Sequence, residues 1–331
     1  MRHPSRNPWE GAGRRVHLQE VAPRDGLQVE AAFVPTAQKI ALVDALSQVG
    51  FAKIEVTAFV SARAIPALRD AQAVLRGIER RAGVTYAVLV PNPVGARHAI
   101  DAGADELNLV MSASETHNLA NLRMTRAQSF ESLCEVASLA RAAGVRVHVS
   151  LSCAFGCPME GDVPPAVVMA WCERIVDSLG AAGLSLCDTT GMAYPPQVAA
   201  LTRAVRERWP RTPLTLHFHD TRGLALANVL AAIDAGADRF DASLGGLGGC
   251  PYAPGASGNA CTEDLVHALA LMGYDTGIDL ARLIEIAASL PALIGHDVPS
   301  RMARAGARSV RHPPPADFEA TRRRALARVA G

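Results

Sequence analysis

The sequence has neither a marked excess of charge of one sign nor a long hydrophobic run. Its 331 residues carry a formal net charge of +1, so neither nucleic acid nor an anionic membrane is expected to attract the chain electrostatically. No apolar run approaches the roughly 20 residues of a membrane-spanning helix, and the N-terminus lacks the apolar core of a secretory signal. We therefore expect no nucleic-acid partner, no membrane partner and a cytoplasmic location.

The cysteines show no pair at CxxC spacing. Their number, seven, is odd, and they are scattered along the chain. A zinc cluster and a disulfide framework are both poor interpretations of this pattern, so a reducing compartment is expected. The positions are Cys134, Cys153, Cys157, Cys172, Cys187, Cys250 and Cys261.

Basic residues gather at both ends of the chain, in "MRHPSRNPWEGAGRR" and "TRRRALARVAG". Terminal stretches of this kind are usually solvated and partly frayed. We predict a flexible N-terminal segment over 1–15, a catalytic domain over 16–300 and a basic C-terminal tail over 301–331.

One sequence pattern recurs between these two ends. A helix-like segment closes on a small residue plus glycine, and a short run rich in Val, Leu and Ile follows, as in "AIDAGADELNLV". Glycine just past a helix is typical of a left-handed cap, and such apolar runs are typical of buried parallel strands. Eight strands are predicted, beginning near Val16, Lys53, Tyr86, Glu106, Arg146, Leu184, Leu214 and Arg239. Eight strand–helix units predict an α/β fold, a (β/α)₈ TIM barrel, with extra helices after about Asp275.

An open, doubly wound sheet is the alternative fold. It requires a glycine-rich phosphate loop after the first strand. The stretch "EVAPRDGLQ" at that place is not such a loop, and the barrel is therefore favoured.

Metal-binding side chains gather at the predicted C-terminal ends of the strands, where TIM barrels hold their active sites. His217 and His219 close strand seven in "PLTLHFHDTRG", and alternate residues of a strand point to the same face. With the carboxylate of Asp25 and the amide oxygen of Asn259 they form a candidate N₂O₂ set for Mg²⁺ or Mn²⁺. The alternatives are tetrahedral zinc, or two hydrogen-bonded core histidines without an ion.

Charged side chains at the same rim complete a candidate active site. Arg24 directly precedes Asp25, and a turn at Gly26 would let both side chains reach the rim. An arginine there can neutralise an enolate or carboxylate oxygen, and Glu55 can hold it in place. A structural salt bridge is the alternative for Arg24 and Glu55, and both roles are compatible. Asp188 ends strand six.

Two further residues are weaker candidates. Cys250 follows "GGLGG" and precedes proline, which is typical of a mobile loop that closes over a site; a bystander thiol is the alternative. His148 lies within a strand and is interpreted as a core histidine.

At these residues the sequence resembles the 3-hydroxy-3-methylglutaryl-CoA lyase family, within the metal-dependent barrel lyases and condensing enzymes. The matching stretches run in order along the chain, and the cysteine-bearing loop is the most specific of them. They are "EVAPRDGLQVE", "KIEVTAFVS", "VLVPN", "SCAFGCPMEG", "SLCDTTG", "LHFHDTRGLALAN" and "GLGGCPYAPGASGNACTEDL".

The resemblance implies a retro-Claisen cleavage that yields acetyl-CoA and a 3-oxo acid such as acetoacetate, in leucine degradation and ketone body metabolism. It implies that the divalent cation is held by Asp25, His217, His219 and Asn259. It also implies that Arg24 binds the substrate and stabilises the enolate, that Glu55 and Asp188 support the site, that Cys250 takes part in catalysis, and that two chains form a homodimer.

The chemistry needs a base for the tertiary hydroxyl and an acid for the enolate. His217 and Asp188 are both candidates for the base. Cys250, or a water on the ion, is a candidate for the final proton donor.

Three positions depart from the pattern of the lyases. The cysteine-bearing loop begins with "SLGG" instead of "SVAG". His148 occupies a position where arginine is usual, and Val29 occupies a position where asparagine is usual. A lyase for another 3-hydroxyacyl-CoA is therefore the main alternative. A condensing enzyme of the isopropylmalate or homocitrate synthase type, a pyruvate-releasing aldolase and a catalytically inactive scaffold are weaker ones.

Overall fold

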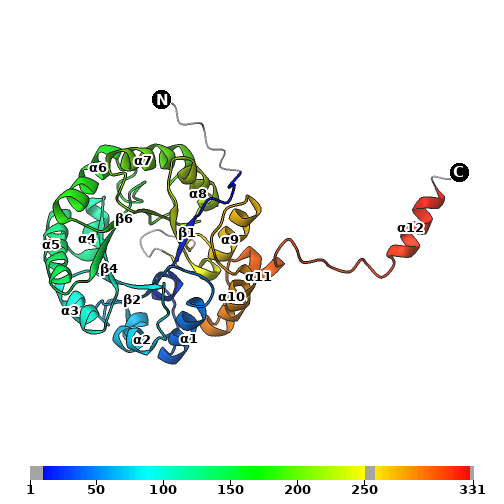
Figure 1. The fold of residues 1–331 in the computed structure, drawn as a ribbon, viewed down its shortest axis with the longest axis horizontal. Helices are drawn as coiled ribbons and strands as arrows, with labels where there is room; N and C mark the ends of the chain where they lie inside the picture. Colours follow the sequence, from blue (N-terminus) through cyan, green and yellow to red (C-terminus); the bar gives the residue numbers. More distant parts are fainter. Residues whose placement is uncertain (1–9, 250–257, 329–331) are drawn as a thin grey trace.

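Eight parallel strands form a closed barrel, with helices packed around its outside (Figure 1). The computed structural model describes residues 10–249 and 258–328. Neighbouring strands pair in chain order, and β8 returns to β1 to close the ring. The strands are β1 His17–Glu20, β2 Lys53–Ala58, β3 Thr85–Val90, β4 Glu106–Ser112, β5 Arg146–Ser152, β6 Gly183–Asp188, β7 Leu214–Phe218 and β8 Arg239–Ala242. The predicted TIM barrel is confirmed, and every strand begins within one residue of its expected start.

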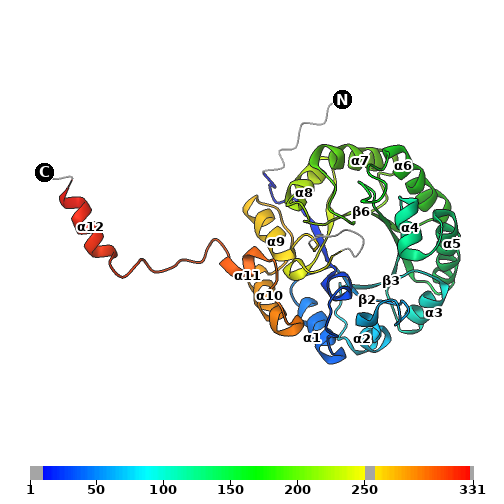
Figure 2. The ribbon, with the colours of Figure 1, turned by 180° about the vertical axis from the view of Figure 1, so that it is seen from behind.

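Helices alternate with the strands and form the outer ring, which is seen from behind in Figure 2. The helices of the ring are α1 Thr36–Leu46, α2 Ala71–Gly77, α3 Pro93–Asp101, α5 Arg126–Ala142, α6 Pro165–Glu173, α7 Pro195–Arg208, α8 Ala225–Asp234 and α9 Thr262–Leu271. An additional helix, α4 Glu115–Leu122, follows β4 and lies on the inner side of α5 (Figures 1 and 2). Short 3₁₀ or π segments occur at η1 Ala22–Gly26, η2 Pro66–Leu68, η3 Arg174–Leu179 and η4 Leu244–Gly246.

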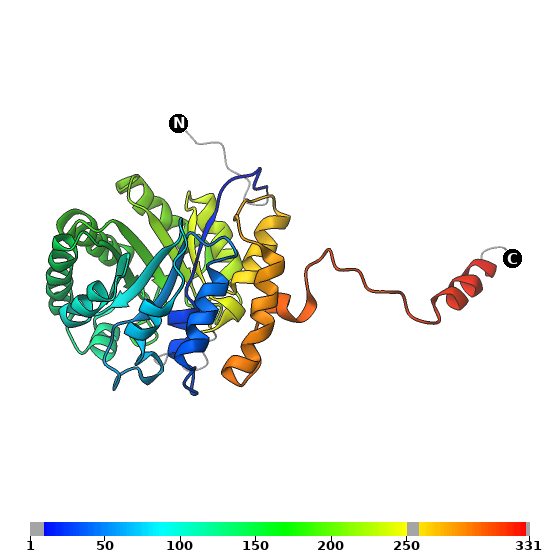
Figure 3. The same ribbon diagram turned by 60° about the horizontal axis from the view of Figure 1, so that its bottom comes forward.

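The extra helices expected after the barrel are present. α10, Leu280–Ile294, packs against α9 and α1, and α11, Arg301–Ala305, packs against α9 and α10. α12, Phe318–Ala327, stands clear of the barrel at the end of an extended segment (Figures 1 and 3). None of the helices in the described ranges is both long enough and apolar enough to cross a membrane.

The chain preceding β1 is fastened to the chain following α9. Gly11 N–H donates to Met272 O (2.5 Å) and Val16 N–H donates to Asp275 O (2.9 Å). Residues 1–9 lie outside the described range, so the division into a flexible 1–15, a domain over 16–300 and a tail over 301–331 stays a prediction.

The turn after β1 positions two charged side chains at the barrel mouth. Residues Ala22–Gly26 form one π turn, in which Gly26 N–H reaches back to Val21 O (3.4 Å). A Cβ at Gly26 would lie 2.9 Å from Leu247 Cβ, so only glycine lets this turn pack against the segment after β8. Arg24 and Asp25 leave the turn on the same side and contact each other.

Candidate metal centre and active site

Asp25, His217 and His219 meet at the mouth of the barrel. One ligand atom of each lies within 4.8 Å of the others, and all three residues are buried. The two imidazole rings are 5.2 Å apart between centroids, as expected for two side chains on one face of β7 and its continuation. The structure therefore brings together three of the four metal-binding residues expected from the sequence.

Asn259 joins the same group through the backbone and the side chain. It pairs with His219 in an isolated antiparallel bridge, and its Nδ2 donates to Asp25 Oδ2 (2.8 Å) and to Leu247 O (3.0 Å). Among the described residues its buried Oδ1 has no hydrogen-bond partner. Because an unsatisfied buried oxygen is costly, a cation beside it would remove that cost, and the donor set of carboxylate, amide oxygen and two imidazoles suits a divalent ion.

The electrostatics of the group keep Asp25 ionised. Burial alone would raise the pKa of this carboxyl, but Arg24, His217, His219 and the Asn259 hydrogen bond outweigh burial and lower the pKa to about 2. A deprotonated carboxylate is the form that binds metal.

Asp241 on β8 orients His217 and is not among the residues expected from the sequence. His217 Nδ1 lies 3.2 Å from Asp241 Oδ2, while His217 Nε2 lies 3.9 Å from Asp25 Oδ2. Burial alone would lower the pKa of His217, but Asp241 and then Asp25 outweigh it and raise the pKa. A carboxylate behind the imidazole fixes the tautomer that turns Nε2 toward an ion. The signal in the sequence was an acidic residue inside a barrel strand.

Arg24 is fixed between two acidic side chains. Its Nε donates to Glu55 Oε2 (2.5 Å), and its Nη1 donates to Asp25 Oδ1. Burial alone would lower the pKa of Arg24, but Asp25 and Glu55 outweigh it and raise the pKa. The guanidinium is therefore charged, buried and placed directly beside the candidate metal ligands.

Two polar residues on β4 and β5 extend this arrangement. Asn108 Nδ2 donates to Glu55 Oε1 (2.7 Å), and Ser150 Oγ donates to Asn108 Oδ1 (2.8 Å). All four groups of this Arg24–Glu55–Asn108–Ser150 chain are buried. Asn108 and Ser150 were not among the residues expected from the sequence, although each is a polar residue between two apolar ones in its strand.

Asp188 lies at the end of β6 with one carboxylate oxygen unpaired. Its Oδ1 accepts from Met192 N–H (2.7 Å), and in the described part of the chain its buried Oδ2 has no hydrogen-bond partner. Burial raises the pKa of this carboxyl to about 6. Such a group is close to the point where it can both take up and release a proton near neutral pH.

Cys250 lies outside the described residues, so its expected role stays a prediction. His148 is buried, as expected for a core histidine, and its Nε2 lies 2.7 Å from Ser185 Oγ.

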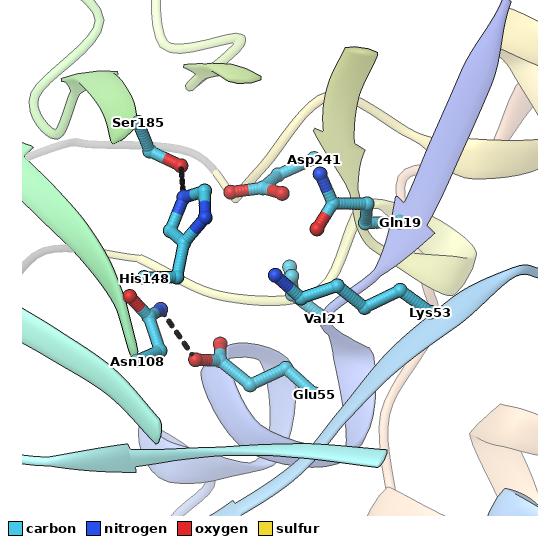
Figure 4. A pocket seen from close by; sticks show the side chains of 8 residues that line it. All are labelled: Gln19, Val21, Lys53, Glu55, Asn108, His148, Ser185 and Asp241. Atoms are coloured by element: carbon cyan, nitrogen blue, oxygen red, sulfur yellow. Dashed lines mark hydrogen bonds between the residues drawn. The ribbon is translucent and has the colours of Figure 1, made fainter. Parts of the chain in front are cut away.

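His148 also lines a small polar cavity of about 10 Å³ beside the site (Figure 4), a space of the size of one water molecule. Glu55 and Asp241, which hold Arg24 and His217, both point into it (Figure 4). The cavity is lined by Gln19, Val21, Lys53, Glu55, Asn108, His148, Ser185 and Asp241.

Comparison with known proteins agrees with this geometry. The chain is 46% identical to hydroxymethylglutaryl-CoA lyase YngG of Bacillus subtilis, over 87% of this chain and 96% of that protein. It is 42% identical to the mitochondrial hydroxymethylglutaryl-CoA lyase of Bos taurus, over 88% of this chain and 90% of the other. The structure superposes with a TM-score of 0.88 on an HMG-CoA lyase from Acinetobacter baumannii in complex with coenzyme A and 3-methylmalate, at 51% identity, covering 91% of this chain and 98% of that one.

The resemblance inferred from the sequence motifs is thereby confirmed. The HMGL-like family matches residues 15–290, a range that holds the whole barrel and every candidate site residue. This chain belongs to the HMGL-like family.

Proposed function

We propose that the protein is a carbon–carbon lyase that cleaves 3-hydroxy-3-methylglutaryl-CoA to acetyl-CoA and acetoacetate. One observation carries the proposal: the Asp25–His217–His219 group and the charged Arg24 lie side by side at the barrel mouth. The Asp25–His217–His219 group can hold an ion against the substrate's 3-hydroxyl. Arg24 can stabilise the negative charge that forms on the neighbouring thioester.

We further propose Mg²⁺ or Mn²⁺ as the cofactor, held by Asp25, His217, His219 and Asn259. When bound, such an ion lowers the pKa of a coordinated hydroxyl and polarises the ketone oxygen that replaces it. The ionised Asp25 and the unsatisfied Asn259 Oδ1 support this assignment.

Asp188 is the better of the two candidate bases. Both nitrogens of His217 are engaged, Nδ1 by Asp241 and Nε2 by the proposed ion site beside Asp25. Asp188 has a carboxylate oxygen with no partner among the described groups and a pKa raised to about 6. We assign it the removal of the 3-hydroxyl proton, either directly or through one water.

Arg24 then stabilises the other product. Loss of the hydroxyl proton lets the C2–C3 bond break, so that C3 becomes the ketone of acetoacetate and the electron pair of the bond passes to C2. The resulting enolate of acetyl-CoA carries its charge on the thioester oxygen, where a fixed guanidinium lowers the barrier. Cys250 remains the proposed donor of the proton that C2 then takes up.

The proposal includes an acyl-CoA substrate, a cytoplasmic location, a homodimer and a place in leucine degradation and ketone body metabolism. The coenzyme A bound in the Acinetobacter complex supports the acyl-CoA substrate. Relatives named as cytoplasmic and as mitochondrial both occur, in mouse and in cattle respectively, so location is best tested by fractionation of the native cell.

Product analysis tests the function. Purified protein with Mn²⁺ is expected to convert 3-hydroxy-3-methylglutaryl-CoA to equimolar acetyl-CoA and acetoacetate, with activity lost in EDTA and in Asp25→Ala. Asp238→Ala, at a half-exposed carboxylate just before β8, is the matched control and should keep full activity. Release of no acetyl-CoA from any 3-hydroxyacyl-CoA would refute the lyase assignment.

A lyase for another 3-hydroxyacyl-CoA is the second candidate. The cavity beside the site favours this candidate. It is lined by His148, which occupies the position of an arginine usual in the lyases, and by the uncharged Asn108 and Ser185. Metal-dependent acetyl-CoA release from a differently branched substrate, at a higher kcat/KM, would identify this alternative.

A further inference from the structure

The helix α12 has an apolar face that no residue in the described ranges 10–249 and 258–328 buries. No described residue of α12 is buried, and the Phe318 and Leu326 side chains are 46% and 61% exposed. Phe318, Ala325 and Leu326 have the i, i+7, i+8 spacing that puts residues on one side of a helix. A ten-residue helix is marginal in water without packing, so a covering surface is required to stabilise it.

The segment before α12 directs the helix away from its own barrel. Residues 306–317 include three consecutive prolines, Pro313, Pro314 and Pro315, which favour a stiff, extended polyproline conformation. Turns occur at both ends of the segment, where Val310 N–H donates to Ala307 O (2.9 Å) and Phe318 N–H donates to Pro315 O (3.0 Å). The residues between these turns, 311–315, span roughly 15 Å at about 3.1 Å per residue. The separation of α12 from the barrel is seen in the views of Figures 1 and 3. A stiff spacer of this reach favours docking on another molecule.

The barrel carries a groove with matching chemistry. It runs between α1 and α10 with a volume of about 510 Å³, and its walls are largely alanine and aliphatic side chains. α10 has fifteen residues, so a ten-residue helix fits along it. The groove is lined by Gln38, Ala41, Leu42, Ala45, Glu285, Ile286, Ser289, Ala292 and Leu293.

Charge favours the same pairing. Residues 301–331 hold eight arginines and two acidic residues, a formal net charge of +6, which leaves −5 on residues 1–300 of a chain whose total is +1. A basic helix is therefore attracted to an acidic barrel, and Glu285 provides a carboxylate on the groove itself.

We propose that α12 docks in the α1–α10 groove of a second copy of this chain, so that two copies exchange their C-terminal helices. The apolar face of α12 covers Ala292 and Leu293 of the other copy, and the triproline spacer bridges the two barrels. In a two-fold dimer the contact forms twice. The exchange lies outside the barrel interior and is independent of the proposed lyase activity.

Disulfide trapping tests the contact in the full-length chain. Ala325→Cys, on the apolar face of α12, is mixed with a size-tagged Ala292→Cys protein and oxidised with copper phenanthroline. We expect a covalent pair of the two variants at a yield at least about tenfold above that of Ala320→Cys with Ala292→Cys, because position 320 is on the other side of the helix. The unsubstituted protein measures the background from native thiols such as the exposed Cys134.

Three outcomes of the trapping experiment would overturn the proposal. They are equal trapping at positions 320 and 325, an intrachain link in the Ala292→Cys/Ala325→Cys double variant at high dilution, and trapping that survives Leu293→Glu. Binding of the protein to vesicles containing phosphatidylserine, together with an absence of trapping, would assign α12 to a lipid surface and also overturn it. Lyase activity should be unchanged in Leu293→Glu, which verifies that the barrel is folded.

Discussion

Arg24 owes its position to side chains that do not contact the substrate in the proposed mechanism. Glu55 holds the guanidinium, and Asn108 holds Glu55 in turn. A hydrogen bond to a charged group contributes about 1.5–3 kcal/mol, and small displacements of a catalytic group are costly in rate. Asn108 is therefore a positioning residue, one contact removed from Arg24.

Replacement of Asn108 by leucine should lower kcat about tenfold and leave KM within about twofold, because the transition state uses the charge of Arg24 more than the ground state does. Steady-state kinetics with the thioester substrate measure this split. Ser150→Ala, which removes only the outer hydrogen bond, should lower kcat by no more than about threefold. A rise in KM without a fall in kcat would instead assign Asn108 to substrate binding.

Asp241 is placed to act on the proposed ion through His217. The substitution Asp241→Asn keeps the shape of the side chain but removes the charge that fixes the His217 tautomer. Loss of such a partner typically weakens metal binding 10- to 100-fold, and we expect that loss for Mn²⁺ titrated calorimetrically into the apoprotein. Asp238→Asn is the control. An equal loss of Mn²⁺ affinity in that variant would show that the effect comes from the overall charge of the barrel and not from contact with His217.

At the level of elements, Glu20 joins three segments at the end of β1. Its Oε1 accepts from Ala22 N–H (2.8 Å) and Leu244 N–H (2.9 Å), and its Oε2 lies 2.8 Å from Thr262 Oγ1. A neutral carboxyl satisfies all three groups, since its O–H can donate to the threonine hydroxyl. Burial raises the pKa of Glu20 to about 8, against the effect of these hydrogen bonds.

The raised pKa makes stability depend on pH. Between the unfolded value of 4.5 and the folded value of about 8, the native state keeps a proton that the unfolded chain has lost. The free energy of unfolding therefore falls as pH rises through that window. From pH 6 to pH 9 the loss from this group is on the order of 2 to 3 kcal/mol. Urea unfolding should show a correspondingly smaller loss for Glu20→Gln than for the unsubstituted protein, and equal losses would contradict the assignment.

The elements that the sequence could predict are those governed by local pattern. Strand starts follow apolar runs bounded by glycine caps, and β-strand alternation correctly puts His217 and His219 on one face. The roles of Asp241 and Asn108 were not predicted, because they depend on side-chain contacts between different strands. Asp241 on β8 contacts His217 on the adjacent β7, and Asn108 on β4 contacts Glu55 on β2, two strands away in the ring. Asn259 was expected beside Asp25, although 234 residues separate the two, because both follow strand ends at the same rim of the predicted barrel.

At the level of the whole molecule, the candidate metal centre links distant parts of the chain. An ion that binds only the folded form stabilises it by about 2.7 kcal/mol at a concentration of 100 times Kd. Mn²⁺ should therefore raise the thermal midpoint by several degrees, as measured by calorimetry. His219→Ala should abolish the shift and His98→Ala, at an exposed imidazole on α3, should keep it. A shift that persists in His219→Ala would locate the ion elsewhere.

The pairing of β1 with β8 also determines when the barrel can close during translation. β1 forms its ladder with β8 through His17 opposite Arg239, and Asp25 meets Asn259 later still. A ribosome adds roughly 5–20 residues per second, so a nascent β1 waits about 10 to 45 s for its last neighbour. During that interval chaperones can bind the unpaired edge of β1. The candidate ion site is complete only after Asn259 has followed β8, so metal binding to a nascent chain would show that the barrel has closed.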